Sequence, residues 1–149
     1  MTALSPHEVE VLLSLDPLLR PKVLALRAQF PGVTLLSGYR PSGYQALLYF
    51  LHQHPELGAA HPELQQSAIA AVPGQSKHER QFACDFELAA LSKLDVVNFG
   101  MAAESLGLTW GGRFTDATHP VGGADNGHVE APFPDAALDT YRSILAWSA

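Results

Sequence analysis

Three side chains of the 149-residue sequence could bind a metal ion: His78, Asp85 and His128. A catalytic zinc ion takes three protein ligands from His, Asp, Glu or Cys and keeps a fourth position for water. Asp125 stands three residues before His128, where a carboxylate could take a proton from that water without binding the metal. These residue types at this spacing predict a hydrolytic zinc site. The plainer interpretation is that the three residues are hydrogen-bonded structural side chains.

Four further residues near these segments have two interpretations each. Arg40 follows a short β-prone run, so it could stabilise the oxyanion of an attacked carbonyl or pair with a surface acid. Ser76 could contact substrate or only form a turn. Trp110 could form a wall of the pocket or lie in the core, and Glu130 could orient a metal ligand or be a solvated strand residue.

Three other residues offer competing chemistry. Asp116 is a minor rival to Asp125 as the general base. His119 could close the metal site as a fourth ligand, which would make the metal structural instead of catalytic. Cys84 could be a nucleophile, but it alternates with phenylalanines on one strand face, so we expect it to be buried as a small apolar residue.

Two predicted strands position the metal-binding residues. In residues 82–88 a period of two places Phe82, Cys84 and Phe86 on one face and Asp85 on the other. A final strand contains Val129 and begins near His128. If these strands are antiparallel neighbours, Asp85 and His128 come together.

The remaining elements follow from helix caps, apolar periodicity and glycine or proline stops. We expect two helices in the segment that ends at Phe30, a strand at 33–37, a helix at 44–52, a loop at 54–74 with room for a helix at 63–71, a helix at 92–106, a strand at 108–110, a glycine-rich loop at 111–127 and a helix from Asp135. This order predicts one α+β domain over residues 1–149, with a small antiparallel sheet flanked by helices.

Composition excludes several functions. Nine basic and fifteen acidic residues give a net charge of -6 without any Lys/Arg stripe, so we expect no nucleic-acid partner. A single cysteine excludes an intrachain disulfide. No apolar run is long enough to span a membrane, and the N-terminus lacks the features of a signal peptide. We therefore expect the protein to be made in the cytoplasm. We also expect a monomer.

The ordered motifs resemble one family of enzymes, the zinc peptidases that cleave peptidoglycan stem peptides. The segments that carry the resemblance are SGYRP (37–41), A-x-PGxSxH (71–78), H-x6-D (78–85), GLTWGG (107–112) and DNGHVE (125–130). The family includes D-Ala-D-Ala carboxypeptidases and dipeptidases and the phage L-alanyl-D-glutamate endopeptidases. The resemblance implies a hedgehog/D-Ala-D-Ala peptidase-like fold.

The resemblance also assigns roles by position. It implies that His78, Asp85 and His128 bind zinc and that Asp125 is the general base. Arg40 is implied as a contact of the substrate or transition state. Two further positions, Ser76 and Trp110, are predicted to bind the substrate, a peptidoglycan stem peptide.

The endopeptidase branch fits this chain better than the others. The segment from Asp125 to His128 has the form Asp-x-x-His and not Glu-x-x-His. The Asp form is more similar to the phage endopeptidase branch. The small residues of the 111–127 loop favour an open cleft suited to a polymer. We therefore expect a phage endolysin that cuts L-alanyl-D-glutamate and reaches the wall through a membrane lesion. The alternatives are a D-Ala-D-Ala carboxypeptidase or dipeptidase, a tail-associated or host enzyme, and a non-catalytic zinc-containing module that binds wall peptides.

One position departs from the family pattern. The family usually has glycine three residues after the first histidine, where this chain has Gln81. The departure puts the local backbone in doubt, since glycine there favours a turn that other residues adopt reluctantly.

Overall fold

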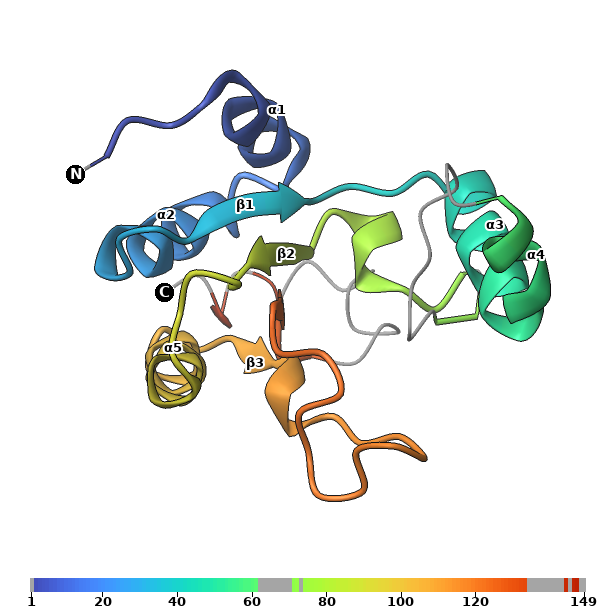
Figure 1. Ribbon diagram of the computed structural model, residues 1–149. Helices are drawn as coiled ribbons and strands as arrows, with labels where there is room; N and C mark the ends of the chain where they lie inside the picture. Colours follow the sequence, from blue (N-terminus) through green and yellow to red (C-terminus); the bar gives the residue numbers. More distant parts are fainter. Residues whose placement is uncertain (1, 62–70, 73, 134–143, 145, 148–149) are drawn as a thin grey trace.

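The computed structural model describes residues 2–61, 71–72, 74–133, 144 and 146–147 of the chain (Figure 1). Its α-helices are α1 (Pro6–Ser14), α2 (Arg20–Gln29), α3 (Ser42–Gln53), α4 (Pro55–Ala60) and α5 (Lys93–Ser105). Its strands are β1 (Thr34–Ser37), β2 (Ala83–Glu87), β3 (Thr109–Trp110) and β4 (His128–Glu130), and two short 3-10 helices are η1 (Lys77–Arg80) and η2 (Gly111–Arg113).

The four strands form one antiparallel sheet in the order β1-β2-β4-β3. The sequence prediction of an α+β fold with a small antiparallel sheet is therefore confirmed. The two strands expected to carry metal ligands, β2 and β4, are direct neighbours at the centre of the sheet.

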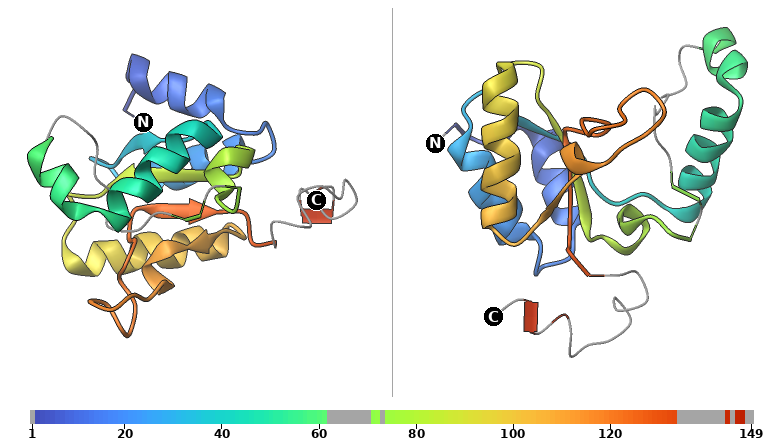
Figure 2. Two further views of the ribbon diagram at one scale, coloured as in Figure 1. Left: turned by 90° about the vertical axis from the view of Figure 1, so that its right-hand side faces the viewer. Right: turned by 90° about the horizontal axis from the view of Figure 1, so that it is seen from below.

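Helices α1, α2 and α5 enclose the core against one face of the sheet. Cys84 and Phe86 of β2 and Val129 of β4 belong to this core. The period of two therefore separates Cys84 from Asp85 as predicted, and it leaves the other face of β2 and β4 for polar residues. Helices α3 and α4 lie on the far side of the molecule from α2 and α5 (Figure 2).

A buried ion pair fixes α1 to the start of the sheet. Ser5 and Glu8 form a capping box at the N-terminus of α1, which satisfies two backbone N–H groups of its first turn. The carboxylate of Glu8 also accepts hydrogen bonds from Arg27 (2.8 Å) and from the main chain of Leu35 in β1 (3.1 Å). Glu8 is only 2% exposed and Arg27 only 7%. These bonds join α1, α2 and β1.

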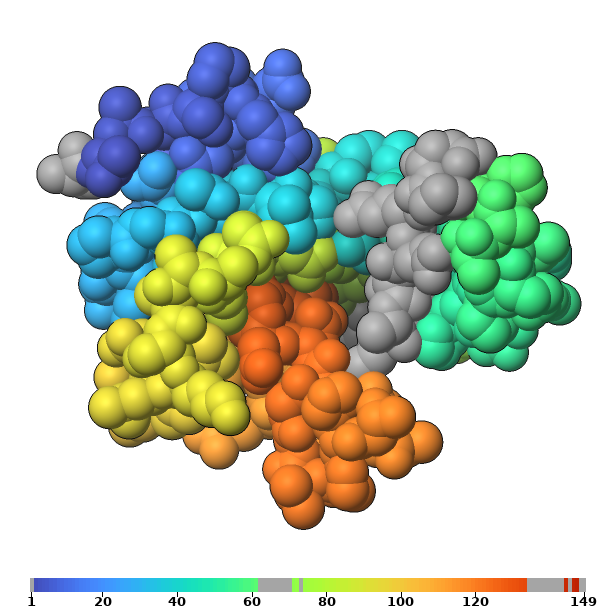
Figure 3. Space-filling view, viewed as in Figure 1, coloured from blue at the N-terminus to red at the C-terminus, as the bar shows by residue number. Residues whose placement is uncertain are grey.

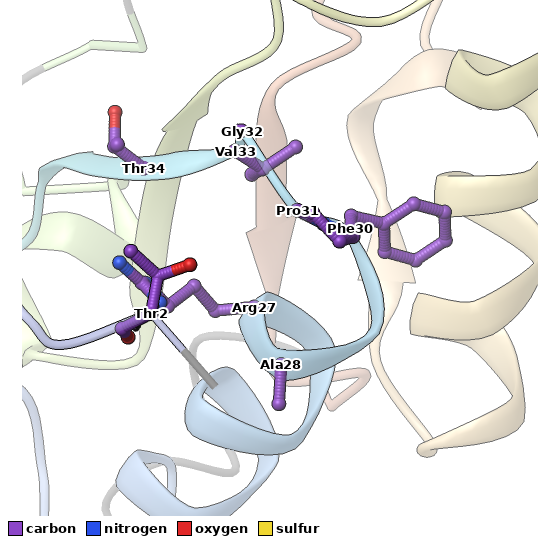
Figure 4. Close-up of a pocket in the computed structure, with 8 residues that line it drawn as sticks. All are labelled: Thr2, Arg27, Ala28, Phe30, Pro31, Gly32, Val33 and Thr34. Atoms are coloured by element: carbon purple, nitrogen blue, oxygen red, sulfur yellow. Dashed lines mark hydrogen bonds between the residues drawn. The ribbon is translucent and has the colours of Figure 1, made fainter.

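A hollow of about 240 Å³ opens beside this ion pair (Figure 4). It is lined by Thr2, Arg27, Ala28, Phe30, Pro31, Gly32, Val33 and Thr34. The guanidinium of Arg27 already donates to Glu8 and to the carbonyl of Thr2. Since the lining contains no histidine or carboxylate, this hollow offers none of the predicted chemistry.

The structure corrects one predicted segment and leaves two untested. The loop expected at 54–74 begins with helix α4, because Pro55 at the first helical position and Glu56 in the first turn favour a helix start. The helix at 63–71 lies almost wholly outside the described residues. The helix from Asp135 lies largely outside them too, although Ile144 and Trp147 are helical. Among the helices described, none has the length and apolar character needed to cross a membrane.

Candidate metal centre

His78, Asp85 and His128 come together on the polar face of the sheet. One ligand atom from each lies within 4.8 Å of the others, an arrangement that could hold a metal ion. His78 is supplied by η1, while Asp85 and His128 are opposite each other in the register of β2 and β4. The predicted strand pairing is thus confirmed.

A β-bulge brings a further donor to Asp85. The β1–β2 register shifts between Leu35 and Ser37, so Leu36 is the extra residue and Ser37 lies opposite Asp85. The Ser37 hydroxyl then donates to the Asp85 carboxylate at 2.7 Å. Arg40, three residues further on, donates to the same carboxylate oxygen at 2.6 Å.

Each histidine has one nitrogen held by the protein and one turned to the common centre. His78 Nδ1 lies 2.7 Å from the carbonyl oxygen of Gly38, an acceptor that requires the N–H on this nitrogen. His128 Nε2 lies 2.8 Å from the Glu130 carboxylate. The remaining nitrogens, His78 Nε2 and His128 Nδ1, lie 3.2 Å apart. These bonds fix the ring orientation as carboxylates and carbonyls do behind metal-bound histidines, which supports the orienting role considered for Glu130.

Charges in this group are strongly coupled. Burial favours neutral Asp85, but His78 and His128 hold the pKa of this carboxyl well below its usual range. Burial likewise disfavours a charged His128, yet hydrogen bonds to Asp85 and Glu130 raise its pKa to about 10. His128 therefore holds a proton between the carboxylates of Asp85 and Glu130, and a metal cation can replace this proton. The donor set of two imidazoles and a carboxylate suits zinc.

Asp125 lies at the edge of the group. Its carboxylate is 3.9 Å from His128 Nδ1, and its side chain is 38% exposed. Burial raises the pKa of Asp125, and the attraction of His128 does not cancel that effect. A carboxyl beside the ligands with a raised pKa suits a residue that accepts a proton and then gives it up.

A pocket of about 160 Å³ opens over these residues. It is lined by Arg40, Gln45, Ala71, Gln75, Ser76, Lys77, His78, Asp85, Phe114, Asp125, His128 and Glu130. Six of the seven residues predicted for the site therefore meet here; the exception is Trp110. Part of the segment between η2 and β4 projects from the lower edge of the molecule (Figure 3).

Trp110 is placed beneath the site instead. Its side chain is 6% exposed, and its ring lies against Gly100 and Gly112, where an added Cβ would overlap it. The indole N–H donates to the carbonyl of Asn126 at 2.7 Å, which ties the turn between Asp125 and His128 to β3. This burial agrees with the core interpretation of Trp110.

Asp116 and His119, the two residues that competed for roles in the site, lie outside the pocket. Asp116 accepts hydrogen bonds from Thr118 and His119 within an exposed loop. Neither Asp116 nor His119 lines the pocket, and His119 is not one of the three clustered ligands. In the described part of the chain, the cluster that could hold a metal therefore has three members, and His119 does not join it.

Gln81 adopts the backbone conformation that glycine would favour. Its φ of 66° and ψ of 15° are in the left-handed region, and it is the one described non-glycine residue with positive φ. The turn expected from the family pattern is therefore formed in spite of the substitution. His78 and Asp85, on either side of Gln81, still meet His128 in one cluster.

Sequence reasoning missed five residues that line the pocket: Gln45, Ala71, Gln75, Lys77 and Phe114. Gln45 is fully buried, donates to the carbonyl of Ala71 at 2.9 Å and lies 3.4 Å from Arg40 Nη1. The ring centroid of Phe114 lies 5.7 Å from that of His128. Lys77 pairs with Glu130. Only Gln45 could have been recognised from the sequence. Its position three residues before the buried Leu48 places a polar side chain on the inward face of α3.

Solved structures with a similar fold are peptidoglycan peptidases. No protein-family model matches the sequence, and neither does any curated protein. The zinc complex of the vancomycin-resistance D,D-pentapeptidase VanY from a VanB-type cassette superposes with a TM-score of 0.54 at 17% identity, covering 91% of this chain and 84% of that one. VanYB in complex with D-alanine-D-alanine gives 0.54 at 19% identity, over 87% and 77% of the two chains. The chain has the fold of these peptidases.

An L-Ala D-Glu endopeptidase is similar to this chain to about the same degree as VanY. The L-Ala D-Glu endopeptidase ChiX of Serratia marcescens has a TM-score of 0.53 at 18% identity, over 86% of this chain and 88% of that one. The predicted peptidase-like fold is therefore confirmed, while the likeness does not separate endopeptidases from carboxypeptidases.

Proposed function

We propose that this protein is a zinc-dependent peptidase that hydrolyses an amide bond in the stem peptide of peptidoglycan. The observation that carries the proposal is the cluster of His78, Asp85 and His128 with Asp125 beside it and an open pocket above. A purely structural metal site would need a fourth ligand, and a module that only binds peptides would have no use for Asp125.

The residues divide the chemistry between them. Zinc would be held by His78, Asp85 and His128, and when bound it lowers the pKa of its water and polarises the carbonyl. Asp125 would take a proton from the attacking water and pass it to the leaving amine. Arg40, which lines the same pocket, meets the charge that develops on the carbonyl oxygen. Ser76, also in the lining, contacts the peptide.

The bond we propose is L-alanyl-D-glutamate, cut by a phage endolysin. The Asp-x-x-His form of the 125–128 segment and the small residues of the 111–127 loop support an endopeptidase with an open cleft. The second candidate is a D,D-carboxypeptidase, because the structures that share the fold include VanYB in complex with D-alanine-D-alanine. Trp110, predicted as a substrate contact, instead supports the turn between Asp125 and His128 through its bond to Asn126.

Digestion of intact sacculi tests the proposal. Zinc-loaded protein should release new N-terminal D-glutamate, identified by mass spectrometry, while release of D-alanine alone would identify the carboxypeptidase. Asp125→Ala should keep one zinc per chain and lose activity by about 10² to 10⁴-fold. Asp116→Ala is the matched control, because Asp116 lies outside the pocket. Equal activity of the two variants would remove Asp125 from its role.

A further inference from the structure

Two cations stand at opposite ends of the candidate metal centre. Arg40 bonds Asp85 at 2.6 Å, and Lys77 bonds Glu130 at 2.9 Å. Glu130 in turn holds His128, so charges alternate in sign from Arg40 through the ligand group to Lys77. Both cations line the pocket, with side chains 14% and 13% exposed.

The pocket becomes positive once a metal is bound. Its lining has two cationic side chains, Arg40 and Lys77, and three carboxylates, Asp85, Asp125 and Glu130. A divalent ion reverses the sign of this balance. A cleft of this sign favours a substrate that carries an anionic group close to the scissile bond.

Lys77 is better placed than Arg40 to meet that group. The guanidinium of Arg40 is directed to Asp85, Ser37 and Gln45. An ammonium group has three N–H donors, and in the described part of the chain Lys77 directs one of them to Glu130. Because Lys77 is nearly buried and lines the pocket, its remaining donors are available to what enters there.

Both candidate substrates have a suitable anion. In L-alanyl-D-glutamate the peptide continues through the side-chain carboxyl, so the D-glutamyl residue after the scissile bond keeps a free α-carboxylate. In a terminal D-Ala-D-Ala unit the residue after the scissile bond keeps the C-terminal carboxylate. We propose that Lys77 is a specificity residue that binds this carboxylate on the leaving side of the scissile bond. The inference rests on the proposed function and adds a substrate requirement to it.

A pair of synthetic peptides isolates the role. One has the free carboxylate on the residue after the scissile bond, and the other has a carboxamide at the same place. Zinc-loaded wild-type protein should prefer the acid by at least about tenfold in kcat/KM, the size expected for one charged hydrogen bond. Lys77→Met should bring that ratio close to one, mainly by raising KM for the acid, and Lys77→Arg should keep most of it.

Glu130→Gln is the control for an indirect effect. Lys77 also supports Glu130, which orients His128. Loss of that support slows both peptides alike, so Glu130→Gln should lower both rates and leave the preference intact. Zinc content and a thermal melt of each variant show that it is folded and loaded.

The outcomes separate the two proposals. If Lys77→Met slows both peptides equally and leaves the ratio unchanged, Lys77 only positions Glu130 and the inference is overturned. A wild-type protein that cleaves both peptides without preference overturns it as well. If loaded wild-type protein cleaves neither peptide nor sacculi, the proposed function itself fails.

Discussion

Replacing Glu8 by glutamine should destabilise the protein by an amount that depends on pH. Glu8 accepts hydrogen bonds from Arg27 and from the backbone of Ser5 and Leu35. The bond from Arg27 is the main cause of a pKa that falls from 4.5 to about 2. Since one pKa unit is worth about 1.36 kcal/mol, the ionised carboxylate stabilises the folded state by roughly 3 kcal/mol at pH 7.

The sign of the pH dependence follows from the lowered pKa. The stabilisation is fully present above the unfolded-state pKa of 4.5 and is lost as the pH falls through about 2. At pH 3 the unfolded chain has already bound its proton while the folded protein has not, so about 1.4 kcal/mol should remain. The variant cannot show this loss, because glutamine does not titrate.

Urea denaturation of the metal-free protein measures the effect. Wild type and Glu8→Gln are compared at pH 7 and pH 3 in the presence of a chelator, so that loss of zinc in acid does not contribute. The gap in unfolding free energy should shrink by about half or more between the two pH values. Glu10→Gln, on the exposed side of α1, is the matched control and should change stability by less than about 0.5 kcal/mol. A gap below about 1 kcal/mol at pH 7, or one that does not change with pH, would refute the reasoning.

Three further substitutions test the surroundings of the site. Gln81→Gly should raise the unfolding free energy by about 1 kcal/mol, measured by urea titration, because the left-handed backbone strains a side chain and not a glycine; a loss of stability would contradict this. Gly111→Ala should raise the zinc dissociation constant at least about tenfold, since its Cβ would overlap the main chain of the turn before β4. Gly43→Ala meets no atom and should leave zinc binding unchanged in the same competition assay. Trp110→Phe should lower stability by about 1–3 kcal/mol through loss of the bond to Asn126 and leave KM unchanged; a selective rise in KM would instead make the ring a wall of the pocket.

The juxtaposition of Asp85 and His128 could be predicted because it follows from local periodicity once their two strands pair. Alternation along β2 separates Asp85 from Cys84, and antiparallel pairing with the strand of His128 then brings the two ligands opposite each other. The alternation needs only the sequence, whereas the choice of these residues, together with His78, rests on the resemblance to the zinc peptidases. Asp125 is tied to His128 by a short turn, so its position follows as well.

The supporting residues could not be predicted because they depend on irregular backbone and on contacts distant in sequence. The bulge at Leu36 shifts the register by one residue, and without it Ser37 would not face Asp85. Lys77 and Glu130 are 53 residues apart, and no local pattern indicates that they pair. The place of Trp110 is set by glycines of α5 and η2 that leave room for its ring.

The ion pair of Lys77 and Glu130 restricts the substitutions that these two positions tolerate during evolution. Loss of Lys77 alone leaves a carboxylate with little exposure and only His128 beside it, while loss of Glu130 alone frees a lysine and releases the His128 ring. Either single step is unfavourable, whereas exchange of both for an uncharged pair that still accepts the His128 N–H avoids the unpaired charge. Descendants of this chain should therefore change positions 77 and 130 together, and a descendant that has changed both should also have changed the acidic substrate that it prefers.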